Sequence, residues 1–492
     1  MDYLNGGVAA AVACGLFAST ANAQVQDWSN LGGNARANGL VNVVGPDGVG
    51  PDDLLWEGGA FSYISWNPVI EGRRVFVVRQ NAFCPNPPPG DATIHALDLD
   101  TGATLWTADI PYEAGDWTTW IAGVKNGRIY ASRSGNGGSV SAPLYCLNAA
   151  TGAVLWHTAG GSIAPRHEIS GGPYAGAVFA SDGDLIITSM NSIQRIDSVT
   201  GQVLWNTARS EQVGNTSGPV LEGNAVYLAD SFGNRIAIRK IDATTGAALY
   251  RGPLLSGVLL HNTPYIGIDG RIYLPYTQNF NVNVDFLYSF TDTGQSIIEN
   301  WRISSGGGGE FSRWGVGPDG SLYSMSWSGT QDDNASGILQ RLNPATGAVI
   351  DTFEEPITGD YMQIHMAVDS RGVLYVSNGT AGGLGGGRLY SFNPDLTLRW
   401  QTPLPGNINQ GAPILGTDGT LIVASTGDVL RAYRSTPRCR SDFNDDGGVD
   451  GDDIIAYFAA WDAAQLSADM DGNQGVDGDD VIIFFALWDS GC

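Results

Sequence analysis

The feature that most constrains the fold is a hairpin pattern that recurs along most of the chain. Each copy has alternating strand residues, an Asp/Asn-x-x-Thr-Gly turn, and a second strand that ends in Trp or another bulky residue. The clear copies are HALDLDTGATLW (95–106), YCLNAATGAVLW (145–156), QRIDSVTGQVLW (194–205), RKIDATTGAALY (239–250) and QRLNPATGAVID (340–351). Two weaker copies are YSFTDTGQSI (288–297) and YSFNPDLTLRW (390–400). The alternation and the turn glycines predict seven half-buried antiparallel hairpins.

A second type of hairpin precedes each of these, with a tight turn centred on glycine. The turn glycines are Gly72, Gly127, Gly183, Gly223, Gly270, Gly320, Gly372 and Gly419. There are thus eight first hairpins but only seven second hairpins, and the eighth unit ends at DVLRAYRST (428–436), one strand short. The segment DDLLWEGG (52–59) at the other end of the repeats can supply that strand.

Closure by an N-terminal strand would leave no open end in a ring of sheets. The pattern therefore predicts an all-β fold, an eight-bladed β-propeller of four-stranded blades over residues 25–435. A β-helix has shorter coils than these repeats, and a β-sandwich array needs no strand from the opposite terminus. Both alternatives fit less well.

Composition excludes some classes of partner. The chain has 492 residues and a formal net charge of −25, with only 25 Lys and Arg against 50 Asp and Glu. A nucleic-acid-binding surface needs clustered basic residues, and an anionic membrane surface also attracts basic ones. No segment after the N-terminus reaches the ~20 apolar residues that a transmembrane helix needs. We therefore expect neither nucleic-acid binding nor a membrane span.

The first 23 residues have the pattern of a signal peptide. An apolar run from Val8 to Ala18 precedes the small-residue site Ala21-Asn22-Ala23, which predicts cleavage before Gln24. A lipoprotein site at Cys14 is the alternative, although the apolar run before it is short. Either interpretation predicts a secreted or cell-surface-associated protein.

Four cysteines remain after the leader, and an even number in a secreted chain suggests disulfides. Cys439 and Cys492 bracket an acidic repeat at the C-terminus, so their pairing would close that unit. Pairing of Cys84 with Cys146 is what remains, and the alternative is two free buried thiols.

Residues Ala96-x-Asp98-x-x-x-Gly102-x-x-x-Trp106 resemble the tryptophan-docking repeat of quinoprotein (PQQ-type) propellers. In that family the Trp packs between neighbouring blades. Trp156 and Trp205 match the pattern, and Tyr250 replaces the Trp in one copy. The segment WSNLGGNARANG (28–39) before LLWEGG is similar to the opening of BamB-like and PQQ-like propellers. The resemblance implies a fold rather than an activity, because propellers carry many functions.

Catalytic signatures are weak in the repeats. The alcohol-oxidising quinoproteins have a vicinal Cys-Cys pair over the PQQ, and no two cysteines are adjacent here; there is also no Cys-x-x-Cys-His for a haem. No Gly-x-Ser-x-Gly, His-Glu-x-x-His or P-loop motif is present. We therefore expect no PQQ cofactor and favour a non-enzymatic binding or scaffold role. An oxidoreductase or a carbohydrate-active hydrolase or lyase is the alternative, since paired carboxylates need not be adjacent in sequence.

A propeller commonly binds ligands in the funnel where its innermost strands begin. Aligning the blades there collects Trp66, Asn67, Trp120, His167, His261, Arg313, His365 and Gln410. Such a set suits a glycan or a peptide, through stacking and hydrogen bonds. The structural alternative is that these side chains cap strand ends and fill the channel. Three histidines could also bind a transition metal.

The C-terminal repeat has the spacing of calcium loops, which place oxygen ligands at positions 1, 3, 5, 7, 9 and 12. The first copy supplies Asp442, Asn444, Asp446, Gly448, Asp450 and Asp453. The second supplies Asp469, Asp471, Asn473, Gly475, Asp477 and Asp480, with Gln474 where Gly usually makes the turn. We therefore predict two calcium sites rather than a disordered acidic tail.

A helix is expected after each loop. The apolar residues Ile454, Ile455, Phe458 and Trp461, and then Val481, Ile482, Phe485 and Trp488, have the spacing of one buried face. The duplicated loop-helix units in 439–492, which start at Cys439 and end in Gly491-Cys492, resemble dockerins of the GC type.

That resemblance implies calcium-dependent docking to a cohesin-like or surface-sorting protein. In dockerins, positions 10 and 11 contact the partner. Here they are Gly451 and Asp452 in the first copy, and Gly478 and Asp479 in the second.

Overall fold

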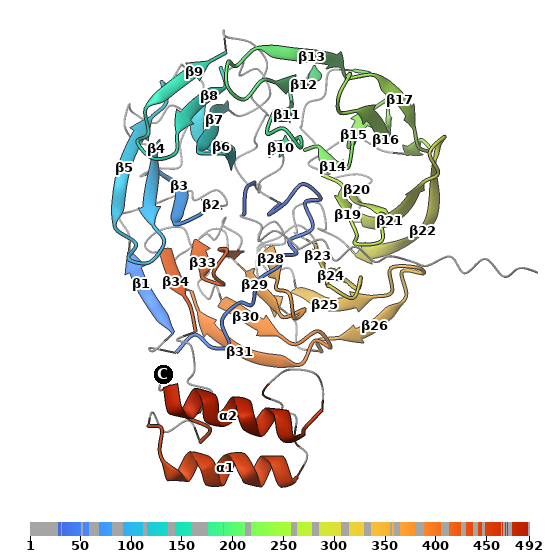
Figure 1. The fold of residues 1–492 in the computed structure, drawn as a ribbon. Helices are drawn as coiled ribbons and strands as arrows, with labels where there is room; N and C mark the ends of the chain where they lie inside the picture. The colour runs from blue at the N-terminus through green and yellow to red at the C-terminus, as the bar shows by residue number, and fades with distance from the viewer. Residues whose placement is uncertain are drawn as a thin grey trace, which may run out of the picture.

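The computed structural model shows eight four-stranded antiparallel blades arranged in a ring (Figure 1). It describes residues 28–30, 32–50, 53–58, 68–80, 92–111, 116–135, 143–158, 176–189, 191–211, 218–256, 263–277, 285–306, 314–328, 336–354, 357–358, 365–378, 388–404, 413–424, 430–435, 441–444, 448–463, 465, 468, 470 and 475–490.

Each blade follows the chain from its innermost to its outermost strand. The first four blades are β2 (Val69–Glu71), β3 (Arg74–Gln80), β4 (Ala92–Asp98) and β5 (Thr104–Asp109); β6 (Asp116–Lys125), β7 (Arg128–Gly135), β8 (Tyr145–Asn148) and β9 (Val154–His157); β10 (Val178–Phe179), β11 (Leu185–Thr188), β12 (Ser192–Ile196) and β13 (Val203–Ala208); β14 (Val220–Glu222), β15 (Ala225–Ser231), β16 (Arg235–Asp242) and β17 (Ala248–Arg251).

The next three blades repeat this order. They are β19 (Tyr265–Ile266), β20 (Ile272–Thr277), β21 (Asp285–Asp292) and β22 (Ile297–Gly306); β23 (Gly315–Val316), β24 (Leu322–Ser328), β25 (Ser336–Leu342) and β26 (Val349–Thr352); β28 (His365–Val368), β29 (Leu374–Asn378), β30 (Arg388–Phe392) and β31 (Leu398–Pro403). The short strands β18 (Leu255–Ser256) and β27 (Ile357–Thr358) extend the fourth and sixth blades.

The eighth blade closes the ring with a strand from the N-terminal side. Its strands β32 (Ile414–Leu415), β33 (Leu421–Ala424) and β34 (Leu430–Tyr433) are completed by β1 (Leu54–Gly58), which pairs antiparallel with β34. The predicted eight-bladed propeller and its N-terminal closing strand are therefore confirmed. The register places Trp56 opposite Ala432 and Gly58 opposite Leu430.

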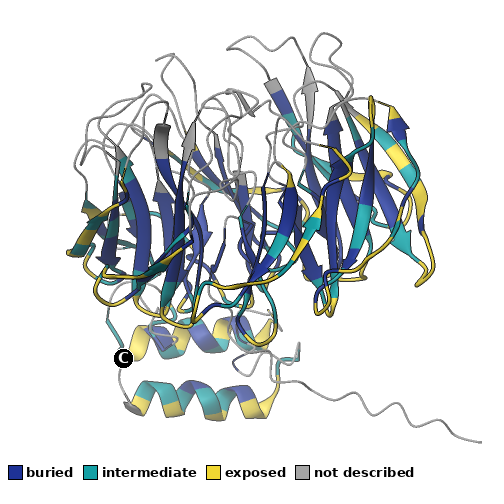
Figure 2. Ribbon diagram, turned by 90° about the horizontal axis from the view of Figure 1, so that it is seen from above, coloured by how far each residue is buried: buried dark blue, intermediate teal, exposed yellow. Residues whose placement is uncertain are grey.

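The turn chemistry that predicted the hairpins is also visible in the backbone. All eight first-hairpin glycines have positive φ, from 57° at Gly223 to 93° at Gly183. Both kinds of tight turn connect strand ends on the same side of each blade, so they gather along one rim of the ring. That rim carries the exposed turns at the bottom of Figure 2. We call it the tight-turn face.

The blade cores are apolar, as the alternation predicts, and one of them contains a cysteine. Cys146 in β8 is fully buried and carries a free thiol, and burial raises the pKa of that thiol to about 12. The expected Cys84–Cys146 disulfide is therefore wrong, and the alternative of a buried thiol holds for Cys146. Cys84, Cys439 and Cys492 lie outside the described residues.

Two helices follow the propeller, α1 (Gly451–Asp462) and α2 (Gly478–Ser490), one after each predicted loop. Their inner faces form a separate core around Tyr457, Ala460 and Phe484. The expected buried stripe is only partly right: Ile454, Phe458 and Trp461 pack against this core, whereas Ile455 and its equivalent Ile482 are 69% and 67% exposed. No helix in the described part of the chain is long and apolar enough to cross a membrane.

Candidate binding sites on the propeller axis and in the helical unit

Residues 28–30 and 32–43 precede the closing strand and cross the middle of the ring; we call them the axial segment (Figure 1). Its backbone meets one innermost strand after another. Ile70 of the first blade donates its backbone N–H to the Trp28 carbonyl at 2.8 Å, and Val124 of the second donates to Ser29 at 2.7 Å. In the third blade, the Asn30 side chain donates to the Ala177 carbonyl at 3.0 Å.

The same pattern continues around the ring. The backbone N–H of Leu221 in the fourth blade donates to the Ala35 carbonyl at 2.8 Å. In the fifth, sixth and seventh blades the donors are the backbone N–H groups of Ile266, Val316 and Val368. They donate to the backbone carbonyls of Arg36, Asn38 and Gly39, at 2.9, 3.2 and 2.9 Å respectively. One segment therefore ties together the inner strands of seven blades.

Three asparagines at intervals of four residues hold the shape of the axial segment. Asn30, Asn34 and Asn38 are all buried. The Asn34 side chain donates to Asn38 Oδ1 at 2.8 Å and to the Leu40 carbonyl at 2.9 Å, and it accepts from the Arg36 backbone at 2.9 Å. Buried amides are stable only when hydrogen-bonded, so this network fixes the segment in one conformation.

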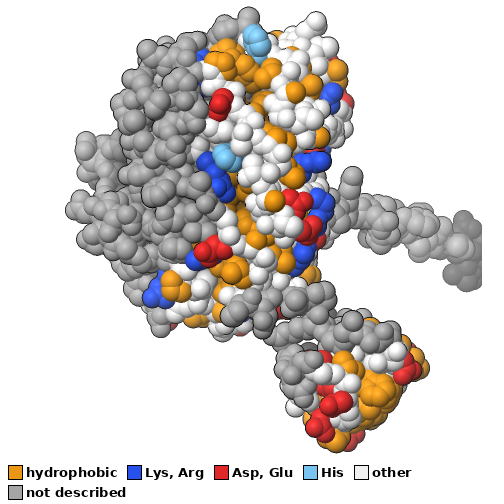
Figure 3. Space-filling model, turned by 90° about the vertical axis from the view of Figure 1, so that its left-hand side faces the viewer, with side chains coloured by type: hydrophobic (Ala, Val, Ile, Leu, Met, Phe, Trp, Pro, Cys, Tyr) orange, Lys and Arg blue, Asp and Glu red, His pale blue; other side chains and the backbone are white. Residues whose placement is uncertain are grey.

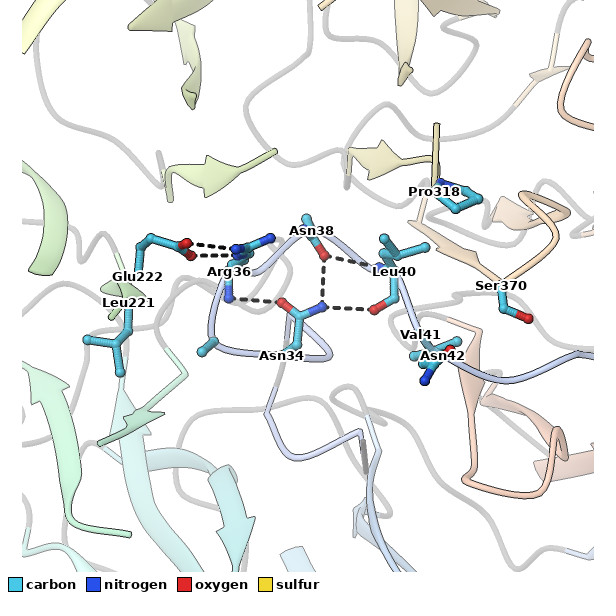
Figure 4. A pocket seen from close by; sticks show the side chains of 11 residues that line it. Asn34, Arg36, Asn38, Leu40, Val41, Asn42, Leu221, Glu222, Pro318 and Ser370 are labelled. Carbon is cyan, nitrogen blue, oxygen red and sulfur yellow. Dashed lines mark hydrogen bonds and ion pairs between the residues drawn. The ribbon is translucent and has the colours of Figure 1, made fainter. Parts of the chain in front are cut away.

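A cavity of about 410 Å³ lies over the axial segment on the tight-turn face (Figure 4). Its described lining is Asn34, Ala35, Arg36, Asn38, Leu40, Val41, Asn42, Leu221, Glu222, Pro318 and Ser370. Glu222 is the only acid in this set. The Arg36 guanidinium donates two hydrogen bonds to its carboxylate, at 2.5 and 2.6 Å. The cavity thus offers amides and one neutralised ion pair, and its described lining has no pair of carboxylates for acid–base hydrolysis.

This cavity is at the ends of the innermost strands, whereas the funnel was predicted at their beginnings. Of the predicted funnel residues, Trp66, Asn67, His167, His261, Arg313 and Gln410 lie outside the described residues. His365 begins β28, and its side chain is not described. Trp120 is 1% exposed in the core of the second blade, where its indole N–H donates to the Arg133 carbonyl at 3.3 Å. The structure therefore gives Trp120 a packing role.

The axial site was missed because its contacts join residues far apart in the sequence; Asn38 and Ile266, for example, are 228 residues apart. The spacing of Asn30, Asn34 and Asn38 was the one available signal.

The helical unit brings together part of each predicted calcium loop. Asp453 is fully buried, and its two carboxylate oxygens accept the backbone N–H groups of Asn444 at 3.0 Å and Asp450 at 2.8 Å. Burial opposes ionisation of Asp453, but these backbone hydrogen bonds outweigh it and lower its pKa. The equivalent Asp480 is also fully buried and accepts from Met470 at 2.6 Å and Asp477 at 2.8 Å. Each loop therefore ends in an acid that is locked to the loop backbone.

The donor set fits a hard cation, because calcium takes carboxylate, amide and carbonyl oxygens. Asp442, Asn444, Gly448, Asp450 and Asp453 of the first loop are described, as are Gly475, Asp477 and Asp480 of the second. Asp446, Asp469, Asp471 and Asn473 lie outside the described residues. Within the described part, no three acidic, His or Cys residues gather closely enough to hold a metal ion. Calcium binding stays a prediction.

Comparison with known proteins agrees with the ring architecture. Residues 90–258 match a family profile described as outer membrane protein assembly factor BamB. The fold is that of a PQQ- and BamB-like eight-bladed propeller. No curated protein sequence matches this chain.

Solved propellers share the fold at low identity. A quinohaemoprotein alcohol dehydrogenase from Comamonas testosteroni is 13% identical with a TM-score of 0.57, over 83% of this chain and 80% of that one. A europium-containing methanol dehydrogenase is 14% identical with a TM-score of 0.53, over 82% and 90%. The Dos1 propeller is 10% identical with a TM-score of 0.52, over 78% and 94%. At these identities the likeness concerns the fold alone.

Proposed function

We propose that this protein is a secreted, non-enzymatic binding or scaffold propeller, anchored to a cell-surface or extracellular complex by a calcium-dependent, dockerin-like unit at its C-terminus. The axial segment is the observation that carries the first half of this proposal. It spans the tight-turn face of the ring, bonds seven inner strands and leaves a cavity whose described acid is already paired with Arg36. Such a cavity suits a small neutral glycan or peptide better than it suits catalysis.

The anchoring half rests on the duplicated loop-helix units and their buried closing acids, Asp453 and Asp480. Because both acids hold loop backbone in place, calcium ligated by the loops would order the first turn of α1 and of α2. The dockerin-like docking residues Gly451, Asp452, Gly478 and Asp479 lie in those turns and are exposed.

Calcium titration of the full-length chain tests the anchoring unit. We expect two binding events by calorimetry, and Asp442→Ala should weaken the first at least about tenfold, because affinity follows the number of charged ligands. Asp462→Asn is the matched control, since Asp462 is exposed at the end of α1 and outside the predicted loop. Absence of binding heat in the wild-type chain would remove calcium from the proposal.

The alternative is an extracellular enzyme, either a quinoprotein oxidoreductase or a carbohydrate-active hydrolase or lyase. Incubation of the purified chain with PQQ, calcium and primary alcohols should give no dye reduction above the rate without protein. Incubation with neutral and acidic polysaccharides should release no new reducing ends. A positive result in either assay would replace the scaffold role with catalysis.

A further inference from the structure

An arginine and a histidine, both half-buried, lie together on the side of the first blade that faces the eighth. In the register of β3 and β4, His95 lies opposite Val77, two residues before Arg79. The two side chains are therefore diagonal neighbours on one face of the sheet. Val77, on the same face, packs into the core that the first and eighth blades share. Figure 3 looks at this side of the ring, where a histidine and basic side chains reach the surface next to one another.

Both side chains contain a buried polar atom that has no hydrogen-bond partner in the described part of the chain. These atoms are Arg79 Nε and His95 Nδ1. No described carboxylate pairs with Arg79, so burial lowers the pKa of its guanidinium and no acid opposes this effect. Buried polar groups are almost always paired, and a group without a protein partner indicates a place where a water or an ion binds.

The equivalent positions at the contact between the third and fourth blades show how the chain satisfies such a place by itself. In the strand register, Asp230 of β15 corresponds to Arg79. By the same alignment, Arg239 of β16 corresponds to His95. Asp230 is fully buried and pairs with Arg239 at 3.0 Å and with Arg209 of the third blade at 3.3 Å. There the chain supplies both the anion and the cations, whereas in the first blade it supplies the cation alone.

Two acids lie on the outer strands that flank this pair, and both have other partners. Asp109, at the end of β5, accepts a hydrogen bond from the Thr93 hydroxyl at 2.8 Å. Glu57 of β1 forms an ion pair with Arg431 at 2.8 Å. Neither of them pairs with Arg79. The guanidinium charge therefore has no counterion among the described residues.

His95 is neutral at pH 7 and can become a second cation. Burial and, to a lesser extent, Arg79 lower its pKa to about 4, against the opposing effect of Asp109. An anion beside the ring would favour the imidazolium and raise this pKa. A guanidinium and an imidazole side by side offer several N–H donors to one acceptor group, which is the chemistry that recognises oxyanions.

We propose that Arg79 and His95 form a binding site for one oxyanion group, a carboxylate, sulfate or phosphate, of an acidic ligand. The guanidinium supplies the charge and parallel donors, and the imidazole supplies a further donor. The ligand presents a single anionic group here rather than a run of them, because the net charge of −25 repels polyanions. The site is separate from the axial cavity, whose described lining includes neither residue.

Histidine NMR of the full-length chain tests the proposal. The chain, labelled with ¹³C at histidine Cε1, is titrated with acid in sodium sulfate and in sodium chloride of equal ionic strength, and His95→Gln assigns the signal. We expect sulfate, but not chloride, to raise the pKa of His95. Because the anion-bound state then holds the extra proton, the Kd of sulfate should fall at least about twofold between pH 7 and pH 5. Titrations with phosphate and acetate at pH 6 distinguish a tetrahedral oxyanion from a carboxylate as the preferred group.

Two arginine variants complete the test. Arg79→Gln should weaken sulfate binding at least about tenfold. Arg235→Gln, which removes the same charge from an exposed position of the fourth blade, should change it less than about twofold. Without sulfate, Arg79→Gln should unfold at a urea concentration no lower than the wild type, because it removes a half-buried charge that has no counterion in the described chain.

Three results would each overturn the proposal. The first is a pKa of His95 that sulfate does not change, or that sulfate and chloride change equally. The second is sulfate binding by Arg79→Gln as tight as that of the wild type. The third is a lower urea midpoint of Arg79→Gln without sulfate, because it would show that Arg79 serves the fold rather than a ligand.

Discussion

Six of the eight contacts between neighbouring blades fall into two kinds. At five of them, the outermost strand of one blade carries a Trp whose indole N–H donates to a carbonyl of the next blade and whose ring covers a turn glycine there. The pairs are Trp56 with Gly102, Trp106 with Gly152, Trp156 with Gly201, Trp205 with Gly246, and Trp301 with Gly347. The indole bonds are 2.9–3.2 Å long. Trp56 shows that the closing strand docks in the same way as the other outer strands.

The contact between the fourth and fifth blades differs. Tyr250 stands where the Trp is expected, and its hydroxyl donates to Asp292 at 2.6 Å. Asp292 also accepts from Tyr227 at 2.6 Å and forms an ion pair with Lys240 at 2.5 Å. A Cβ added to Gly294, in the same turn, would have no atom within 4 Å other than those of its chain neighbours.

The difference shows that one fold can join its blades by packing or by charge. An indole over a glycine gains from buried apolar area and a neutral hydrogen bond, neither of which depends on pH. The Tyr250 contact depends on an ionised Asp292, so it should respond to acid. Substitutions at the two kinds of contact can separate these sources of stability.

Gly246→Ala should have the largest effect. Gly246 has φ +73°, and an added Cβ would lie 2.6 Å from the Trp205 ring. Left-handed strain of 1–2 kcal/mol and displacement of the indole should together cost about 3 kcal/mol of unfolding free energy, measured by urea denaturation. Gly72→Ala is the control, because Gly72 has φ +58° and nothing near its Cβ position. Equal costs at the two positions would mean that the indole does not pack as described.

The parts of the fold that sequence predicts are those set by short-range chemistry. A glycine in a tight-turn pattern predicts a positive φ, and the glycines of all eight predicted turns have positive φ. Leu396 shows the limit, since it adopts φ 64° where the eroded seventh copy lacks the glycine. The axial segment could not be predicted, because its partners come from seven blades. The incorrect prediction that Ile455 and Ile482 are buried has a similar origin. Helical spacing identifies an apolar face, but it cannot tell which of the adjacent Ile454 and Ile455 points inward.

The candidate sites were less predictable than the fold. A calcium loop has fixed ligand spacing, so it can be proposed from sequence, whereas a funnel is formed by side chains from separate blades. Trp120 has the residue type of a ligand-stacking group, but it packs inside the second blade. The Arg36–Glu222 pair of the axial cavity joins residues 186 positions apart, and nothing local marks either of them.

Asp292→Asn should have the next largest effect and should be the only one of these changes that depends on pH. Burial opposes ionisation of Asp292, but hydrogen bonds from Lys240, Tyr227 and Tyr250 outweigh it and lower its pKa from 3.8 to about 2. A lowered folded-state pKa contributes stability above the unfolded pKa and loses it as pH falls through the folded one. The variant should therefore be about 2 kcal/mol less stable than the wild type at pH 7, and this difference should shrink between about pH 4 and pH 2.

Trp156→Phe is the matched control for that measurement. It removes the neutral hydrogen bond from the indole to the Ser198 carbonyl, so its cost should stay constant over the same pH range. If the difference in unfolding free energy between the wild type and Asp292→Asn is also constant over this pH range, the charge of Asp292 does not hold the fourth and fifth blades together.

Gly294→Ala should have the smallest effect, although Gly294 is the turn glycine of the Tyr250 contact and has φ +83°. With open space at the Cβ position, only backbone strain of about 1 kcal/mol opposes the substitution. Urea denaturation at pH 7 gives the loss of unfolding free energy for Gly294→Ala and for Gly246→Ala. The ratio of the two losses compares the two kinds of contact at equivalent turns. If Gly294→Ala costs as much as Gly246→Ala, Tyr250 must cover its turn as closely as a Trp does. The contact would then be one of packing, with the ion pair added to it rather than replacing it.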